Sequence, residues 1–225
     1  MTNTAYVELL NLACGALLAT AVLILWRRQF AAIIRWFGVQ GLALASLAAI
    51  LAVHGHDARL GAIAAGVFAL RAVALPWLLR RALARAEAAA VQPQRETRPL
   101  VNVTASLLAA AVLTLLAYAV SQPLTALTPA SPAAHAIPLG MAVVLIGFFS
   151  LVTRRRALAQ VTSFLLMDNG ITAVGLLTVA STSLLVELGV SLDVLLAVLV
   201  LQVLTGRLRE TFGSTDLDEL RELRD

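Results

Sequence analysis

The sequence predicts an all-α, polytopic membrane protein with seven transmembrane helices. Three properties of the 225-residue chain lead to this fold class: 60% of its residues are hydrophobic, only 13% are charged, and long apolar runs separate short clusters of arginine. Soluble domains average about 45–50% apolar and about 25% charged residues. The chain therefore has too little polar surface to cover a water-soluble core, which excludes a soluble enzyme and a disordered chain.

Seven apolar segments are long enough to cross a bilayer as helices. Crossing the hydrocarbon core takes roughly 20 mainly apolar residues, and irregular backbone facing lipid would leave N–H and C=O groups unpaired. In chain order the predicted spans are 6–26, 33–53, 60–79, 100–120, 136–152, 160–180 and 184–205. The fifth of these spans is short, with 17 residues.

The placement of arginine predicts the orientation. All 17 basic residues are arginine; fifteen of them fall after the first, third, fifth and seventh spans, whereas the alternate loops hold only Arg59. The positive-inside rule makes the arginine-rich side cytoplasmic. We therefore expect the N-terminus outside and the C-terminus in the cytoplasm. The first span is expected to be retained, because its arginines follow the apolar run rather than precede it.

Loop composition divides the predicted chain into three regions. Four prolines and no charge between Gln122 and Pro138 predict an external loop. It separates a four-helix N-terminal membrane region, 1–130, from a three-helix module, 136–213. Residues 214–225 alternate acidic residues with leucine and predict a short amphipathic helix in the cytoplasm, capped by Ser214 or Thr215.

The sequence shows no pattern of catalytic, metal-binding or nucleic-acid-binding residues. The arginine clusters lie between apolar runs rather than on one solvated face, so no nucleic-acid partner is expected. Cys14 is the single cysteine, and His54 and His56 flank a glycine at the outer end of a span. Neither pattern indicates a metal site. We expect no catalytic residue, metal or cofactor on this chain.

Four ionisable side chains are predicted well inside the spans: Arg71, Asp168, Glu187 and Asp193. A charge at the bilayer centre costs about 2.5–3.5 kcal/mol on insertion scales, and such residues are commonly functional. From the nearest cytoplasmic arginines, the helical rise places Asp168 about 18 Å deep, Asp193 about 21 Å deep and Arg71 about 13–14 Å deep. The two aspartates therefore lie at nearly the same depth, near the middle of the bilayer.

Two carboxylates at that depth cannot both be ionised cheaply, and a carboxyl group that is sometimes neutral can take up and release a proton. We therefore interpret Asp168 and Asp193 as proton-transfer residues, with Glu187 as a third candidate and Arg71 as the buried cation beside them. Two alternatives stay open. Arg71 could only neutralise one carboxylate in a static ion pair, and Glu187 could be solvated near the outer surface.

The last ninety residues carry a pattern that resembles the K subunit of respiratory complex I. A short helix opens at Ile137-Pro138-Leu139 and ends in Arg154-Arg155-Arg156. The next helix has a central acid in Phe164-Leu-Leu-Met-Asp168-Asn169-Gly170-Ile171, and the third runs from Leu184 to a closing Gly206-Arg-Leu-Arg. The whole chain, with four extra helices in front, resembles hydrogenase-4 component E, a membrane subunit of formate hydrogenlyase-type and related energy-converting NiFe hydrogenases.

The resemblance implies a role for the buried carboxyl groups. In the K subunit, two membrane glutamates on the second and third helices belong to the proton pathway. By position Asp168 takes the first place and Asp193 the second, with Glu187 as the rival for the second, although this chain has aspartate rather than glutamate at both places.

The same resemblance implies the surroundings of the chain. It would be a multi-pass, non-redox subunit without a cofactor of its own, in the cell membrane of a prokaryote. Its neighbours would be the lipid bilayer, antiporter-like and complex I H-subunit-like membrane subunits, and peripheral NiFe hydrogenase-like and iron–sulfur subunits.

Two other functions are compatible with the sequence. A subunit of a multi-subunit cation/proton antiporter would share the three-helix module, but the four-helix N-terminal region argues against it. A stand-alone small-solute permease would usually show inverted repeats with broken helices, and the sequence has no such symmetry.

Overall fold

The computed structural model describes residues 2–88, 102–127 and 131–178, and within these ranges the chain is helical apart from short connections. The elements are α1 (Asn3–Trp26), α2 (Phe30–Gly55), α3 (Ala58–Val67), the π-helical segment η1 (Phe68–Ala74), α4 (Leu75–Ala88), α5 (Val103–Leu127), α6 (Pro132–Thr153) and α7 (Ala157–Thr178). The third membrane-capable span is Ala58–Arg85, in which α3, η1 and most of α4 follow one another without a break.

Six helices in the described ranges are long and apolar enough to cross a membrane. The prediction of an all-α, multi-pass membrane protein is confirmed at this level. The predicted span 184–205 lies outside the described residues, and so do Glu187, Asp193 and the tail. The count of seven spans therefore stays a prediction.

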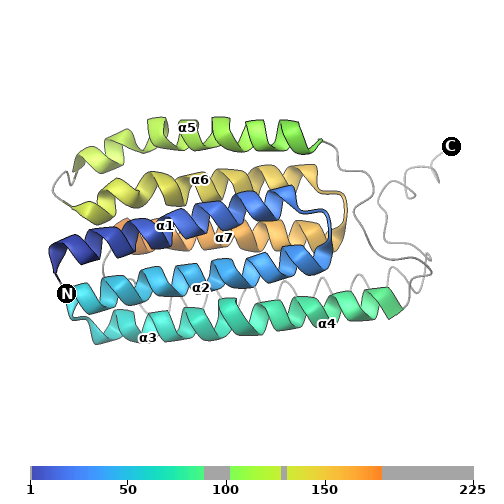
Figure 1. Ribbon diagram of the computed structural model, residues 1–225, viewed down its shortest axis with the longest axis horizontal. Coiled ribbons are helices and arrows are strands. Elements are labelled where there is room, and N and C mark those ends of the chain that lie inside the picture. The colour runs from blue at the N-terminus through green and yellow to red at the C-terminus, as the bar shows by residue number, and fades with distance from the viewer. Residues whose placement is uncertain (1, 89–101, 128–130, 179–225) are drawn as a thin grey trace.

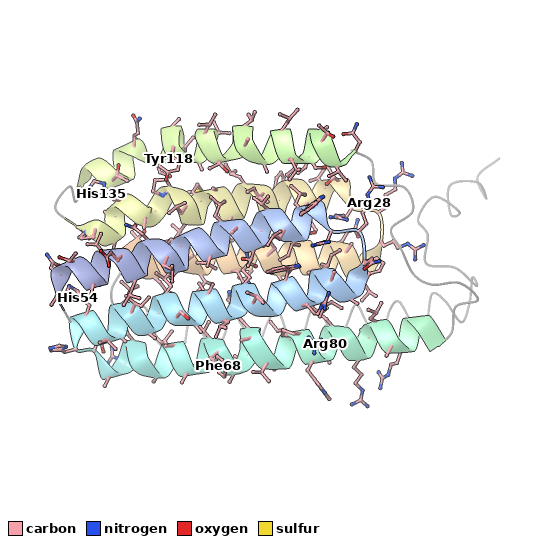
Figure 2. The ribbon with its side chains drawn as sticks, viewed as in Figure 1. Arg28, His54, Phe68, Arg80, Tyr118 and His135 are labelled. Carbon is pink, nitrogen blue, oxygen red and sulfur yellow. The ribbon has the colours of Figure 1, made fainter. Side chains whose placement is uncertain are left out.

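The described spans form an up-and-down bundle in which successive spans run antiparallel, with α3, η1 and α4 counted as one span (Figure 1). The largest contact joins α6 and α7, while α5 packs mainly on α6 and only lightly on α1. On the other side, α3 and η1 lie against α2. Arg28 and Arg80 lie toward one end of the bundle and His54 and His135 at the other (Figure 2). This alternation agrees with the predicted arginine pattern.

Small residues bring α6 and α7 together. A Cβ atom at Gly147 would lie 2.6 Å from the backbone of Met167, and one at Gly170 would lie 2.6 Å from the backbone nitrogen of Val144. Both distances are far below a van der Waals contact, so any larger residue would push the two backbones apart. Such close approach of small residues is a common basis of helix packing in membranes.

The predicted external loop between Gln122 and Pro138 is wrong in its extent, because helices occupy both of its ends. Helix α5 continues through Pro123 to Leu127, and α6 begins at Pro132. As a result α6 has 22 residues rather than the predicted 17. The reason is that proline in the first turn of a helix removes no helical hydrogen bond, and prolines inside membrane helices are tolerated where neighbouring groups satisfy the freed carbonyls. Pro123, Pro132 and Pro138 therefore lie within helices, while Pro129 lies outside the described residues.

Local capping explains where the helices of the first hairpins begin and end. The Asp57 carboxylate accepts hydrogen bonds from the backbone N–H groups of Arg59 and Leu60 and so starts α3. His56 ends α2 in a left-handed conformation, with φ of 53°. The turn is tied to the N-terminal part of α1 by His54, whose ring stacks on Tyr6 with 3.7 Å between the ring centroids.

Candidate functional site

The third span is irregular at the position that carries Arg71. Between Phe68 and Ala74 the helix widens to a π-helix, and the Leu75 N–H donates to the carbonyl of Leu70, five residues earlier. Pro76 follows and has no N–H to donate. Helices deviate from regular geometry at prolines and π-helical turns, and π-helical turns inside α-helices are frequent at functional sites.

Two glycines of α2 let its backbone lie directly against this segment. A Cβ atom at Gly41 would overlap the carbonyl group of Arg71, and one at Gly38 would touch the Pro76 ring at 3.4 Å. Because no larger residue fits at Gly41 without a shift, the contact fixes where the Arg71 backbone lies relative to α2. The π-helical segment is therefore held from outside as well as by its own hydrogen bonds.

Arg71 forms a buried salt bridge with Asp168 of α7. The Nη2 atom of Arg71 lies 2.7 Å from Oδ2 of Asp168, and the Arg71 side chain is only 1% exposed. The Nη1 atom of Arg71 donates a hydrogen bond of 2.7 Å to Oδ1 of Asn169, the next residue of α7. The guanidinium group thus contacts two consecutive side chains of α7, one charged and one neutral.

Two amide side chains extend this contact across the bundle. Asn169 Nδ2 donates to Gln40 Oε1 at 3.0 Å, and Gln40 Nε2 donates to the carbonyl oxygen of Leu17 at 3.4 Å. Both amides are buried. The side chains of Asp168, Arg71, Asn169 and Gln40, which we call the polar chain, therefore connect α7, η1, α2 and α1.

The polar chain has the composition that a buried ion pair requires. Removing two charges from water is expensive, and the attraction between them offsets that cost only where further hydrogen bonds satisfy the remaining polar atoms. Asn169 provides an acceptor for the guanidinium group, and Gln40 in turn accepts from Asn169. The ion pair is therefore supported by neutral groups that do not titrate.

The structure brings together two of the four predicted site residues. Arg71 and Asp168 are in direct contact, which agrees with the alternative that Arg71 neutralises a carboxylate. Glu187 and Asp193 lie outside the described residues. Whether any of the four transfers protons is not tested by these contacts.

Sequence reasoning missed Gln40 and the role of Asn169. Gln40 is the single amide in a mainly apolar span, and it stands in Gly38-Val39-Gln40-Gly41, where the two glycines make close helix contact. The sequence signal that could have identified Gln40 is an amide placed between two glycines in the middle of an apolar span. A search for charged residues inside the spans does not find Gln40, because an amide side chain carries no charge.

Hydroxyl groups on α6 and α7 near Asp168, on both sides of it along α7, mostly serve helix packing. Ser150 Oγ and Ser163 Oγ lie 2.7 Å apart and join α6 to α7. The hydroxyls of Thr162 and Thr172 donate to carbonyls of their own helix, four residues earlier. These bonds give each hydroxyl a local partner.

No group of three or more histidine, cysteine, aspartate or glutamate side chains that could hold a metal ion occurs in the described part of the chain. His54 stacks on Tyr6, and the Nδ1 atom of His56 lies 2.9 Å from the Val53 carbonyl oxygen. Both histidines therefore have structural contacts at the end of α2. The absence of a metal on the whole chain stays a prediction.

Comparison with known proteins adds to this picture. No family model and no solved structure matches the chain. The chain is 50% identical over 225 residues to the Mycobacterium tuberculosis protein described as uncharacterized protein Rv0085, and the match covers 100% of both. It is also 24% identical over 216 residues to hydrogenase-4 component E of Escherichia coli and of Shigella flexneri, covering 96% of this chain and 97% of theirs.

These relationships support the predicted resemblance to hydrogenase-4 component E as a distant homology over most of the chain. They do not test the resemblance to the K subunit. With half of its residues identical over the full length of both proteins, the chain belongs to the same family as Rv0085 of Mycobacterium tuberculosis, with hydrogenase-4 component E as a distant relative.

Proposed function

We propose that the chain is a non-redox membrane subunit of a hydrogenase-like or complex I-like oxidoreductase. It anchors the complex and contributes Asp168 to a lateral proton path. The observation that carries the proposal is the buried salt bridge between Asp168 and Arg71 inside a bundle of membrane-capable helices. Ionisable groups inside membrane segments are rare and commonly mark ion or proton pathways.

The contacts of Asp168 couple its protonation to the position of Arg71. While Asp168 is ionised, the pair is neutral and the 2.7 Å contact is favourable. When Asp168 takes up a proton, the pair carries one positive charge in a low-dielectric surrounding, where an uncompensated charge is strongly unfavourable. Proton uptake therefore favours movement of the guanidinium toward another carboxylate. Glu187 and Asp193 are our candidates for that carboxylate.

Asn169 and Gln40 position Arg71 without exchanging protons themselves. Asn169 accepts a hydrogen bond of 2.7 Å from the guanidinium group, and Gln40 orients Asn169 by accepting from its amide at 3.0 Å. The Arg71 backbone stays fixed against Gly41, so the response to a change in the charge of the pair is a movement of the long Arg71 side chain. The polar chain thus combines a titrating group with a movable partner.

The extent of the homology supports component E rather than the antiporter alternative. A small antiporter subunit made of the three-helix module would align only with the C-terminal part of this chain. The match to hydrogenase-4 component E covers 96% of the chain, including the four-helix N-terminal region. We further propose that the arginine-rich end faces the cytoplasm, where the peripheral hydrogenase-like and iron–sulfur subunits would dock.

Co-purification tests the proposed complex. The full chain, tagged and produced in its host, is extracted in a mild detergent and its associated proteins are identified by mass spectrometry. We expect NiFe hydrogenase-like, iron–sulfur and antiporter-like subunits in a fixed ratio to the chain. Purification of the chain alone from intact membranes, with transport of a solute by the isolated protein, would contradict the proposal.

Substitution of Asp168 tests the proton path. In inverted membrane vesicles energised by the electron donor of the complex, Asp168→Asn should abolish proton translocation, whereas Asp168→Glu should retain part of it because the carboxyl group remains. Thr162→Val is the matched control on the same helix, since the Thr162 hydroxyl bonds only to its own helix. Unchanged translocation in assembled Asp168→Asn complexes would overturn the role of Asp168.

A further inference from the structure

Helix α1 has one side that the described chain leaves uncovered. It packs mainly on α2 and α6, and in the view of Figure 1 it lies at the front of the bundle, before α7. Four residues of the uncovered side are exposed, namely Glu8, Asn11, Gly15 and Ala19. Each follows the previous one by three or four residues, so they lie along a single face of the helix, which we call the α1 face.

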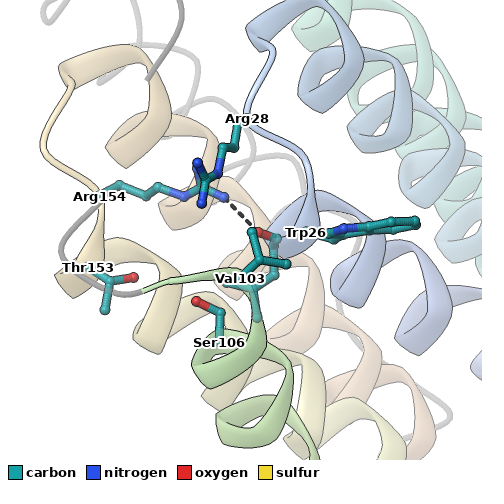
Figure 3. Close-up of a pocket in the computed structure, with 7 residues that line it drawn as sticks. Trp26, Arg28, Val103, Ser106, Thr153 and Arg154 are labelled. Atoms are coloured by element: carbon teal, nitrogen blue, oxygen red, sulfur yellow. Dashed lines mark hydrogen bonds between the residues drawn. The ribbon is translucent and has the colours of Figure 1, made fainter. Parts of the chain in front are cut away.

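The α1 face extends into the depth of the hydrocarbon core. Trp26 ends α1 at the arginine-rich end, where Trp26, Arg28 and Arg154 line one small pocket (Figure 3). A tryptophan at the end of a span, next to basic residues, is typical of the interface between membrane and water. Asn11 lies 15 residues before Trp26, about 22 Å along the helix axis, whereas the hydrocarbon core is about 30 Å thick. The Asn11 amide therefore lies within the apolar layer.

The side-chain amide of Asn11 has no hydrogen-bond partner in the described part of the chain. Ser46 of α2 is also exposed, but its hydroxyl donates to the Leu42 carbonyl of its own helix. An amide that faces acyl chains loses its hydrogen bonds to water and gains none in return, which is unfavourable. Polar side chains inside membrane segments accordingly face other protein groups or a water-filled cavity. Asn11 thus indicates a protein neighbour rather than lipid on the α1 face.

Small residues next to Asn11 leave room for a neighbouring backbone. A Cβ atom at Gly15 would meet nothing within 4 Å, and Ala19, one turn further along, is exposed as well. In membranes, small residues four positions apart let two helices approach closely, and amide side chains form hydrogen bonds across such contacts. The α1 face therefore offers both a close approach for a helix and a polar group that needs a partner.

We propose that the α1 face binds a transmembrane helix of a different membrane subunit, which forms a hydrogen bond with the Asn11 amide and passes close to Gly15. The inference rests on the proposed membership in a membrane complex, and it adds which face of this chain contacts a neighbour.

Glu8 favours a different subunit over a second copy of this chain. It is exposed on the α1 face, one turn before Asn11, and forms no ion pair within the described residues. In a two-fold symmetric pair the same patch meets itself, so the two Glu8 carboxylates would lie close together and repel each other. A basic or hydrogen-donating side chain of another subunit would instead complement the charge of Glu8.

Photo-crosslinking from the α1 face tests the proposal on the full chain in membranes of its host. The photoreactive residue benzoylphenylalanine replaces Leu12, which borders the face and is 71% exposed; in the matched control it replaces Leu115 of α5, which is also 71% exposed. We expect the Leu12 position to give one discrete product, whose crosslinked peptide lies in a membrane span of another subunit. The Leu115 position should not crosslink to that peptide.

Substitutions on the α1 face measure the strength of the contact. Gly15→Ile fills the space for the neighbouring backbone and should lower the amount of that subunit recovered with the chain at least tenfold. Asn11→Leu should lower it about threefold, as expected for the loss of one hydrogen bond between membrane helices. Gly61→Ile on α3 is the matched control, because a Cβ atom there also meets nothing within 4 Å; it should change the recovery less than twofold. The isolated Gly15→Ile and Gly61→Ile chains should have similar melting temperatures, which excludes a folding defect.

Three results would overturn the proposal while the proposed complex stands, provided that hydrogenase-like subunits still co-purify with the unmodified chain. They are equal recovery of the neighbouring subunit with Gly15→Ile and Gly61→Ile, a Leu12 product that contains only lipid, and a Leu12 product with a second copy or another segment of this chain. A Leu12 product with a membrane span of a subunit unrelated to hydrogenases would support the α1 face as a docking surface and contradict the proposed function.

Discussion

Helices α7 and α5 are both membrane-capable, yet they have opposite surroundings. In α7, 61% of the residues in the most apolar window are buried, against 17% in α5. Helix α7 places Asp168 and Asn169 against η1, and its glycine contacts bind it closely to α6. Helix α5 contacts α6 along one side and leaves Leu108, Val112 and Leu115 exposed.

This difference indicates how the chain accommodates charge in an apolar bundle. Buried polar groups need partners on several sides, and only helices enclosed by neighbours can provide them. The polar chain therefore lies where η1, α2 and α7 meet, while the loosely packed α5 carries apolar side chains suited to lipid or to a neighbouring subunit. If this contrast is correct, substitutions on the two helices should differ greatly in their effects.

The largest expected effect comes from breaking the ion pair from one side. Asp168→Asn leaves the Arg71 guanidinium buried without its counter-charge, and such losses cost about 3–5 kcal/mol. We expect a lowered melting temperature in detergent, measured by thermal unfolding, while the complex still assembles in the membrane. Adding Arg71→Gln should restore most of the stability, because the double variant buries no charge. A fully stable Asp168→Asn single variant would contradict this view of the pair.

The next effect concerns the close contact between α2 and the π-helical segment. Gly41→Ala introduces a Cβ atom that overlaps the Arg71 carbonyl group, and such overpacking costs about 1–3 kcal/mol. Gly15→Ala on α1 is the matched control, since a Cβ atom there meets nothing within 4 Å. We expect the melting temperature to fall for Gly41→Ala alone. Equal melting temperatures for both variants would show that the contact is not needed.

The smallest effect is expected on the exposed face of α5. Leu115 is 71% exposed, so Leu115→Ala should change the free energy of unfolding in detergent by about 0.5 kcal/mol or less. Leu44 on α2 is fully buried, and Leu44→Ala should cost about 2–5 kcal/mol. If Leu115→Ala is as harmful as Leu44→Ala in the detergent-solubilised protein, α5 is packed more tightly than the structure indicates.

The sequence predicts the six described spans well, because long apolar runs and arginine clusters fix where membrane helices begin and end. It fails at Pro123 and Pro132, because proline indicates a loop in water but is tolerated at helix starts and inside membrane helices. The fold is therefore more predictable from hydropathy than from residues that break helices in soluble proteins.

The candidate site is only partly predictable. Arg71 and Asp168 stand out because charge inside a span is costly, but the sequence does not indicate which carboxylate Arg71 contacts. The π-helical segment is not readable from composition, and Gln40 is inconspicuous because hydropathy treats it as one polar residue in an apolar run. Their importance depends on tertiary packing, namely the position of Gly41 against Arg71.

The central claim is that Asp168 moves protons and does more than neutralise Arg71. The double variant Arg71→Gln/Asp168→Asn separates these roles, because it removes the carboxyl group without leaving a buried charge. We expect this variant to assemble into the complex and to retain electron transfer, while donor-driven proton translocation in inverted vesicles falls to the level of uncoupled membranes. Translocation close to that of the unmodified complex would show that the ion pair is structural and that the proton path lies elsewhere.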